Sequence, residues 1–242
     1  MPHMPRAPAL ALAALLLALP AAGQEMDARY DLSMRGITAG QIVIRAREAG
    51  GAYAVNAAGQ PTGLVGALSD YSYSGEAQGR VADGRLVAAA YAEREVDDGK
   101  VTTTRMTFRG TTPAEVQIEP PREPRPYDVE PTAQRGVVDT LTGLYAVLRD
   151  TDRAGACAQS HDLFDGRRVA RLSLGPAEAG ADGTIRCRGE YRRVAGYDPE
   201  DMARRPATPL TFVYGPAGGE GRVRVVEVRS PSRLGEVVLR RR

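Results

Sequence analysis

The sequence has few of the residues from which metal and catalytic sites are built. Its 242 residues include two cysteines, two histidines and no tryptophan. His3 lies in the N-terminal segment discussed below, which leaves His161 alone with the two cysteines. A tetrahedral metal site needs about four such ligands. Glycine-rich phosphate or dinucleotide motifs and the Asp-rich spacing of a calcium loop are also absent. We therefore expect no metal, no cofactor and no enzymatic activity.

The sequence also lacks the excess of positive charge that a nucleic-acid-binding protein needs. The 32 Lys and Arg residues nearly balance the 30 Asp and Glu residues, so we expect no nucleic-acid partner. The charge is nevertheless distributed unevenly along the chain. Residues 24–166 carry 15 basic and 21 acidic side chains, whereas residues 167–242 carry 16 basic and 9 acidic ones. An arginine-rich surface ending in Arg240, Arg241 and Arg242 could contact an anionic envelope surface. Alternatively, the two halves neutralise each other within the fold.

Long hydrophobic runs are absent apart from one at the N-terminus. Residues 9–19 are all Ala or Leu, follow Arg6, and precede Pro20 and small residues. Eleven helical residues rise about 16 Å, roughly half of a bilayer core. This pattern is typical of a signal peptide, and we predict cleavage after Gly23 and a soluble periplasmic protein that does not span the membrane. An uncleaved membrane anchor is the alternative.

Export changes the interpretation of the cysteines. Cys157 and Cys187 both lie in the predicted mature chain, and a pair of cysteines in an oxidising compartment favours one disulfide. Free thiols, or redox or metal chemistry, are the alternatives. In the segment around Cys187, apolar and charged residues alternate, which predicts a strand with Cys187 on its buried face.

The period of apolar residues along most of the chain is two, which predicts a mainly β protein. Dipeptides such as Asp83-Gly84 and Asp98-Gly99 are typical of hairpin turns, because glycine tolerates the positive φ that these turns require. We interpret residues 36–40 as a turn between the first two strands. The predicted strands are 29–35, 40–47, 52–59, 67–78, 85–96, 100–109, 114–118, 156–164, 167–175, 184–194, 208–215, 221–229 and 234–240.

Two segments have helical patterns. Residues 139–149 begin with Asp139, a residue that favours the N-cap, and place Leu141, Leu144, Tyr145 and Leu148 on one face, so this amphipathic helix should pack on a sheet. A short second helix is predicted at 199–205. A proline-rich connection at residues 119–131 precedes the first helix. We expect one exported domain, 24–242, formed by a curved antiparallel sheet or an open, spiral β-barrel; two separate domains are the alternative.

One sequence segment has the residue types of a hydrolase triad. Ser160, His161 and Asp162 are consecutive, and on a strand neighbouring side chains point to opposite faces. A catalytic triad needs residues that converge in space. We therefore interpret this segment as a polar strand edge rather than a catalytic site.

Several motifs taken together carry a family resemblance. They are Tyr30, GITAG at 36–40, TGL at 62–64, DTLTGLY at 139–145, Cys157, FDGRR at 164–168, CRGEY at 187–191 and GY at 196–197. In this order they resemble the domain of unknown function 3108, found in exported proteins of Gram-negative bacteria. The resemblance implies a periplasmic antiparallel β protein and supplies no catalytic residues. Cys157 and Cys187 match the family's cysteine positions, which supports the disulfide.

Two functions follow from these patterns. The first is a non-catalytic binding module whose partly apolar sheet face holds a lipid, a lipoprotein or another envelope component. The second is a structural or scaffolding protein that supports the integrity of the cell envelope. Inward-facing residues such as Leu210 look the same in a sequence whether they line a filled core or a pocket, so the sequence leaves both open.

Overall fold

The computed structural model describes residues 23–242. Its strands form one sheet in the order β7-β6-β5-β4-β3-β2-β1-β15-β14-β13-β12-β11-β10-β8, and β9 pairs with β14. The predicted cleavage site after Gly23 is at the edge of the described residues, and the predicted signal peptide otherwise lies outside them. The strands are β1 (Gln24–Met34), β2 (Ile37–Ala49), β3 (Ala52–Pro61), β4 (Ser72–Ala82), β5 (Arg85–Asp97), β6 (Lys100–Arg109), β7 (Thr112–Glu119), β8 (Val137–Asp139), β9 (Thr151–Asp152), β10 (Ser160–Phe164), β11 (Val169–Ala179), β12 (Ile185–Ala195), β13 (Ala207–Pro216), β14 (Arg222–Ser232) and β15 (Gly235–Arg241).

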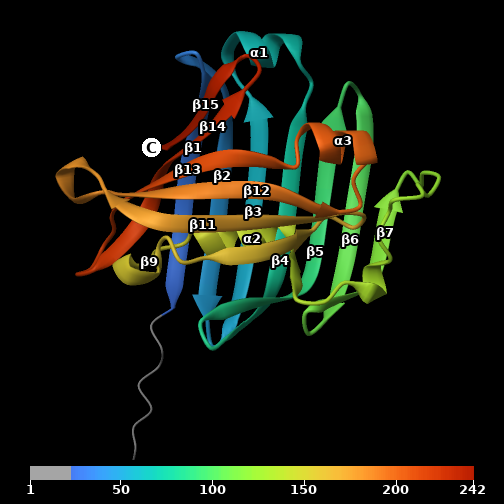
Figure 1. Cartoon of the computed structure of the whole chain (residues 1–242), viewed down its shortest axis with the longest axis horizontal. Helices are drawn as coiled ribbons and strands as arrows, with labels where there is room; N and C mark the ends of the chain where they lie inside the picture. Colours follow the sequence, from blue (N-terminus) through green and yellow to red (C-terminus); the bar gives the residue numbers. More distant parts are fainter. Residues whose placement is uncertain (1–22) are drawn as a thin grey trace, which may run out of the picture.

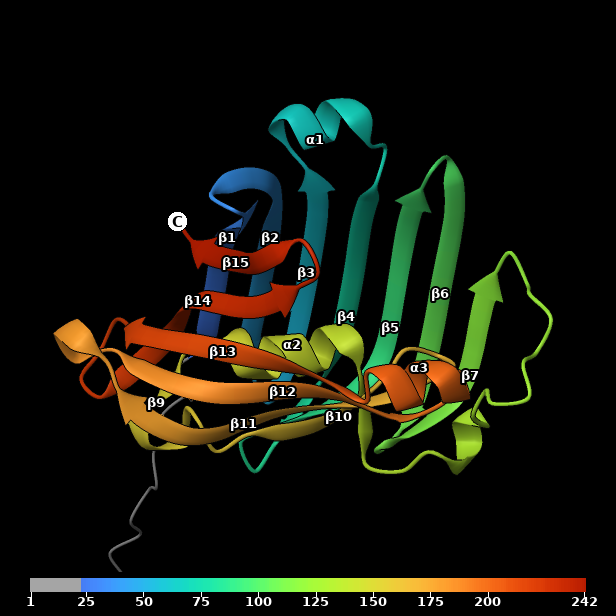
Figure 2. The ribbon, with the colours of Figure 1, turned by 45° about the horizontal axis from the view of Figure 1, so that its top comes forward.

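The sheet bends over onto itself, as Figures 1 and 2 show. β1 to β7 form a long antiparallel meander, and β10 to β15 return across its inner face. All paired strands are antiparallel except β8 and β10, which run parallel. The result is a nearly closed, barrel-like sheet with one seam, which confirms the predicted mainly β fold.

Tight turns with glycine set the register of the meander. Asp83-Gly84 joins β4 to β5, and Asp98-Gly99 joins β5 to β6. All four residues have positive φ, at 50° and 73° in the first turn and 48° and 72° in the second. This is the backbone of a type I′ turn, whose twist matches that of the flanking strands, so both predicted turns are confirmed.

Four strand predictions need correction at their starts. The strand predicted at 29–35 is β1, which already begins at Gln24. The segment 67–78 was expected to be a strand, but Gly63–Leu68 forms a short helix, α1, and β4 begins at Ser72. α1 has only six residues, and Thr62 makes no side-chain cap hydrogen bond, so it leaves almost no periodic signal. The first turn lies at Arg35-Gly36 rather than across residues 36–40, so β2 already begins at Ile37. β10 begins at Ser160 rather than 156, because Ala156 still has helical backbone angles after the turn Arg153–Gly155.

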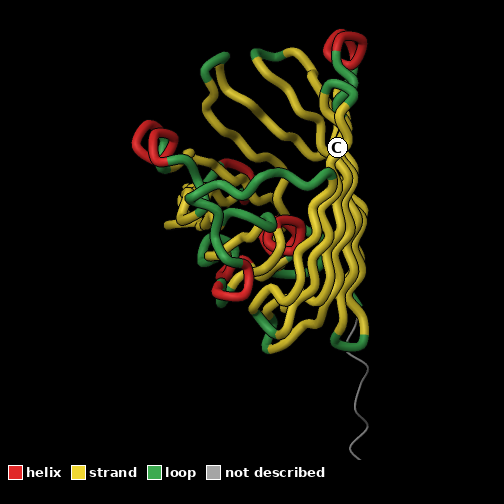
Figure 3. Tube along the Cα trace, turned by 90° about the vertical axis from the view of Figure 1, so that its right-hand side faces the viewer, coloured by secondary structure: helices red, strands yellow, loops and turns green. Residues whose placement is uncertain are grey.

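The predicted main helix is present as α2 (Thr140–Leu148), with Asp139 as its N-cap. It lies between the two layers of the sheet, as Figures 2 and 3 show. It contacts β3, β4 and β5 on one side and β10 and β14 on the other. Burial extends to Thr142, Gly143, Ala146 and Val147 as well as to the predicted apolar positions. Leu144 is the exception, because 40% of its surface is exposed.

The seam lies between β7 and β8, the two ends of the strand order. There the Val137 amide donates a hydrogen bond to the Thr111 carbonyl, at 3.2 Å. The turn between β10 and β11 also packs against β7, since a Cβ placed on Gly166 would lie 3.3 Å from Ile118 Cδ1. Backbone and turn contacts therefore bring the two edges together without a continuous ladder.

The second predicted helix is present as α3 (Pro199–Arg204), with Pro199 in its first turn. Asp198 caps it by accepting a hydrogen bond from the Glu200 amide, at 2.8 Å. Within residues 23–242, none of the helices combines the length and the apolar character needed to cross a membrane.

Candidate binding face

A buried polar group fixes α2 to the meander. The Asp139 carboxylate accepts hydrogen bonds from the amide and the hydroxyl of Thr142, at 2.8 and 2.7 Å. The Tyr53 hydroxyl on β3 lies 2.7 Å from the Thr142 hydroxyl. Burial raises the pKa of Asp139 to about 6, although the hydrogen bonds from Thr142 oppose this shift. The helix is therefore held at a fixed depth between the layers.

Beyond α2, the inner face carries an apolar strip that solvent reaches. We call this set of partly buried side chains the inner strip; it consists of Leu32, Ile42, Leu210, Val228 and Leu239. Leu239 pairs with Leu32 of β1 on one side and with Val228 of β14 on the other. The inner strip thus crosses the join between the first and the last strand of the chain.

The inner strip continues the hydrophobic core toward solvent. Side chains two residues apart on a strand share a face, so Ile42 lies on the same face as Ile44, and Leu210 on the same face as Phe212. Ile44 and Phe212 are 4% and 3% exposed, whereas their neighbours in the strip are partly exposed. Figure 2 shows the cause: the returning strands lie across the lower part of the meander and leave its end near α1 uncovered.

Hydroxyl and carboxylate groups lie on the same inner face, on β4 and β5. The hydroxyls of Tyr73 and Tyr91 are 3.4 Å apart, and Tyr91 donates a short hydrogen bond to the Glu93 carboxylate. Burial raises the pKa of both tyrosines, so both hydroxyls stay neutral at ordinary pH. The inner face therefore combines an apolar strip with a group of polar side chains.

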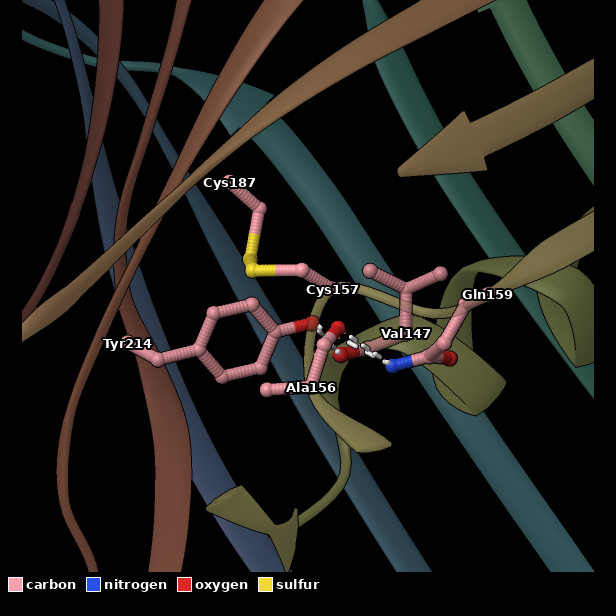
Figure 4. The surroundings of a disulfide bond; sticks show 6 residues. All are labelled: Val147, Ala156, Cys157, Gln159, Cys187 and Tyr214. Atoms are coloured by element: carbon pink, nitrogen blue, oxygen red, sulfur yellow. Dashed lines mark hydrogen bonds between the residues drawn. A yellow bond between two sulfur atoms is a disulfide. The ribbon is translucent and has the colours of Figure 1, made fainter. Parts of the chain in front are cut away.

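The predicted disulfide is present and is confirmed. Cys157 and Cys187 are bonded, with their Cα atoms 5.3 Å apart. Figure 4 shows the bond beside Tyr214, whose hydroxyl donates to the carbonyl of Val147 in α2, at 3.0 Å. Cys187 is fully buried, as the alternation of β12 predicted. The cross-link and the tyrosine hold the segment that follows α2 against the returning strands.

The Ser160, His161 and Asp162 side chains do not form a triad. The Asp162 carboxylate is paired with Arg171, at 2.7 Å. The hydrogen bond found for His161 joins its Nε2 to the side-chain oxygen of Gln159, at 3.4 Å. Burial, with additional repulsion from nearby arginines, lowers the pKa of His161, so the ring is mostly neutral at neutral pH.

The C-terminal arginines contact the protein itself. Arg240 pairs with the nearly buried Glu227, at 2.6 Å, and Arg242 pairs with Asp31, at 2.7 Å. Arg241 donates to a backbone carbonyl of β1, at 3.4 Å. An anionic surface would have to compete with these partners. A role for the three arginines in contacting such a surface stays a prediction.

A separate hollow lies on the outer face of β3 to β7. It has a volume of about 420 Å³. Alanines contribute to its floor, and amide and charged side chains surround it, among them Asn56, Gln78 and Arg105. The alternation of the strands places these side chains opposite the core. The hollow is open to solvent, and it lies on the other side of the sheet from the inner strip.

Comparison with known proteins places the chain in a family. Residues 29–191, about two thirds of the sequence, match the family described as "Protein of unknown function (DUF3108)". The chain belongs to this family. The matched range includes β2 to β11, α2 and both cysteines of the disulfide, whereas the GY motif at 196–197 lies beyond it. No curated protein and no solved structure gave a significant match.

The sequence patterns missed the inner strip as a site. Leu210 was recognised as an inward-facing residue, but its exposure depends on how far the returning strands extend over the meander. Leu144 was expected on the packed face of α2 and is instead 40% exposed. Neither position carries a local signal, because in both cases the neighbouring residues come from distant strands.

Proposed function

We propose that this domain is a non-catalytic binding module of the bacterial periplasm that holds the acyl chain of a lipid or lipoprotein against the inner strip. The observation that carries this proposal is the strip itself, a row of partly exposed apolar side chains on the inner face of a barrel-like sheet. Water is a poor partner for such a surface, and an acyl chain is a good one.

Energetics favour a flexible apolar ligand. Complete burial of a Val or Leu side chain contributes about 1.5–3 kcal/mol. Each member of the inner strip is already partly covered, so a ligand gains only part of this amount from each. Contact with the whole strip is therefore needed for useful affinity. Tyr73 and Glu93, which are partly exposed on the same face, supply polar groups for the head of such a ligand.

The proposed location has support from the disulfide. Disulfides such as Cys157–Cys187 persist in oxidising compartments, and the sequence before residue 23 has the pattern of a signal peptide. Fractionation of cells that make the full chain would test this. We expect the processed protein in the periplasmic fraction, and recovery from the cytoplasm would contradict the location.

The ligand proposal is tested by titrating the protein with the fluorescent fatty acid cis-parinaric acid. We expect saturable binding, weakened about tenfold, or roughly 1.4 kcal/mol, by Val228→Thr combined with Leu239→Gln. Val194→Thr is the matched control, because Val194 is 41% exposed and lies outside the strip. Circular dichroism checks that the variants fold. Absence of saturable binding, or equal affinity in all three proteins, would overturn the proposal.

A structural role in the envelope is the second candidate, and the filled interior favours it. α2 occupies the space between the layers, and Leu141, Tyr145 and Val147 are at most 2% exposed. A barrel-like sheet with a filled interior suits a protein that acts as a rigid scaffold. A folded protein that binds no fatty acid but is retained on purified cell-wall material would favour this role.

A further inference from the structure

Two glutamates without an ion-pair partner lie on the inner face, toward the end that the returning strands leave uncovered (Figure 2). Glu93 and Glu95 of β5 share this face with Tyr91, because side chains two residues apart on a strand point the same way. Arg94, between them in the sequence, lies on the outer face. Glu93 is partly exposed and Glu95 is exposed. Among the described residues neither forms an ion pair, whereas Glu227 is paired with two arginines.

The charges closest to the two glutamates are also negative. Burial, together with the carboxylates of Glu95, Asp97 and Glu93, raises the pKa of Tyr71 to about 12. The cation on the neighbouring strand is Lys100, and the strand register places it directly opposite Asp97. Lys100 therefore offsets the charge of Asp97 and leaves the charges of Glu93 and Glu95 uncompensated.

A buried hydroxyl beside the glutamates also lacks a partner. Thr104 of β6 lies directly opposite Glu93 in the strand register, so the two side chains share a face. Thr104 is 2% exposed, and its hydroxyl forms no hydrogen bond within residues 23–242. Its methyl group faces Gly166, but packing alone gives no reason for a buried hydroxyl at this position. Two carboxylates and a free hydroxyl oxygen together offer acceptors to a ligand that carries N–H donors and positive charge.

The strand register places these acceptors in line with the inner strip. Ile42 of the strip lies opposite Gly59 on β3. Gly59 lies opposite Tyr73 on β4, and Tyr73 lies opposite Glu95. Neighbouring strands are about 4.8 Å apart, so Ile42 and Glu95 are separated by about 14 Å across the sheet. A ligand lying across the strands would meet apolar side chains first, then a tyrosine, and then the carboxylates.

This order of groups matches an apolar chain that ends in a cation. A primary ammonium group has three N–H donors and no acceptor, and the faces of tyrosine rings attract cations. An anionic head would instead meet two like charges. We propose that the ligand of the inner face is an amphiphile with a cationic amine head, and that Glu93, Glu95 and Thr104 bind the amine. This inference rests on the acyl-chain proposal for the inner strip and names the head of that ligand.

Competition against bound cis-parinaric acid tests the charge of the head. The protein is used as recovered after export, and the probes are kept below the concentrations at which they form micelles. At pH 7 dodecylamine is protonated and dodecanoate is ionised, while their chains are of similar length. We expect dodecylamine to displace the reporter at a concentration about tenfold lower than dodecanoate does. Propylamine should not displace it, because it lacks the chain.

Variants assign the preference to the named residues. Glu93→Gln combined with Glu95→Gln should bring the two probes to within about twofold of each other. Glu76→Gln combined with Glu115→Gln is the matched control, since both carboxylates are exposed on the outer face and the same net charge is removed; it should keep the preference. Thr104→Val should weaken dodecylamine about fivefold and leave dodecanoate and the free energy of unfolding unchanged. Circular dichroism checks that the variants fold.

The outcomes separate this inference from the acyl-chain proposal. Equal displacement by dodecylamine and dodecanoate, displacement by propylamine, or an unchanged preference in the Glu93→Gln, Glu95→Gln variant would overturn the amine head. The acyl-chain proposal would stand in those cases, provided that cis-parinaric acid still binds. If cis-parinaric acid does not bind, the acyl-chain proposal fails, and calorimetric titration with dodecylamine alone decides this one: the absence of binding that depends on Glu93 and Glu95 would overturn it as well.

Discussion

The hydroxyl of Tyr53 on β3 lies 2.7 Å from the hydroxyl of Thr142 on α2. Thr142 donates its own proton to Asp139, so Tyr53 is the donor of the pair. A side chain of the first meander thus completes the hydrogen bonding of a helix that follows it by 89 residues. This small group sets the depth of α2 between the two layers of the sheet.

Removing the two hydroxyls should have unequal effects. Tyr53→Phe leaves Thr142 bonded to Asp139, and we expect it to lower the free energy of unfolding by about 1 kcal/mol. Thr142→Val removes the hydroxyl that bonds both Tyr53 and Asp139. It should lower the free energy of unfolding by about 2–3 kcal/mol, because two buried polar groups lose a hydrogen-bond partner. Urea unfolding followed by circular dichroism measures both values. Equal losses in the two variants would contradict the assigned directions of the hydrogen bonds.

Asp139 should give the protein a pH-dependent stability. Its pKa is about 6 in the folded protein, above the ordinary value of 3.8, so the folded state binds the proton more tightly than the unfolded state does. The free energy of unfolding should therefore rise as pH falls from about 7 to about 4, by up to about 3 kcal/mol from this group. Conversely, this contribution is lost as the pH rises through 6.

Asp139→Asn keeps an oxygen that caps the helix and cannot ionise. We expect this variant to lose that part of the pH dependence and to be at least as stable as the unchanged protein at pH 7. Asp198→Asn, at the cap of the short helix α3, is the control and should keep the slope. Urea unfolding at several pH values measures it, and an unchanged slope in Asp139→Asn would show that another group is responsible.

The disulfide should contribute substantially to stability. Cys157 and Cys187 are 30 residues apart, and closing a loop of that size stabilises a protein by roughly 3.5 kcal/mol through the entropy of the unfolded chain. Replacing both cysteines with alanine should lower the free energy of unfolding by about that amount. Thiol titration of the unfolded, unreduced protein is the independent check, since two free thiols would refute the cross-link.

Gly143 allows α2 to approach β10 closely. A Cβ at this position would overlap the Leu163 Cδ2 atom. Alanine favours a helix over glycine by about 1 kcal/mol, but the overlap with Leu163 should outweigh this gain, and we expect Gly143→Ala to destabilise the protein by about 1–2 kcal/mol. Thermal or urea unfolding measures the change.

A double variant separates the clash from the effect on helix propensity. Leu163→Ala alone should destabilise by about 2–5 kcal/mol because it creates a cavity. If the two residues collide as the structure indicates, Gly143→Ala should cost less in the Leu163→Ala background than in the unchanged protein. The same cost in both backgrounds would rule out this contact as the cause.

Local chemistry explains which parts of the fold the sequence predicts. Asp83-Gly84 and Asp98-Gly99 form the expected turns because positive φ is a property of the dipeptide itself. Asp139 caps α2 for the same kind of local reason. By contrast, α1 is too short for a periodic pattern. The exposure of the Leu144 side chain depends on which strands cover the helix.

The partners of the C-terminal arginines show where such prediction stops. Arg240 and Arg242 form a basic cluster in the sequence, but their acidic partners, Glu227 and Asp31, come from two different neighbouring strands. No spacing in the sequence predicts that β15 inserts between β14 and β1. The inner strip depends on the same long-range arrangement, because Leu239 meets Leu32 and Val228 only after β15 is in place.

The pairing of β1 with β15 also makes the middle of the sheet the last part to be completed. Tyr30 pairs with Arg241, near the opposite end of the chain. Until β15 has been synthesised, β1 and β14 both present open edges, which are templates for aggregation, and contacts of such high sequence separation form slowly. Loss of β15 alone, a truncation of a few residues, would therefore divide the sheet into two halves with two new edges between them.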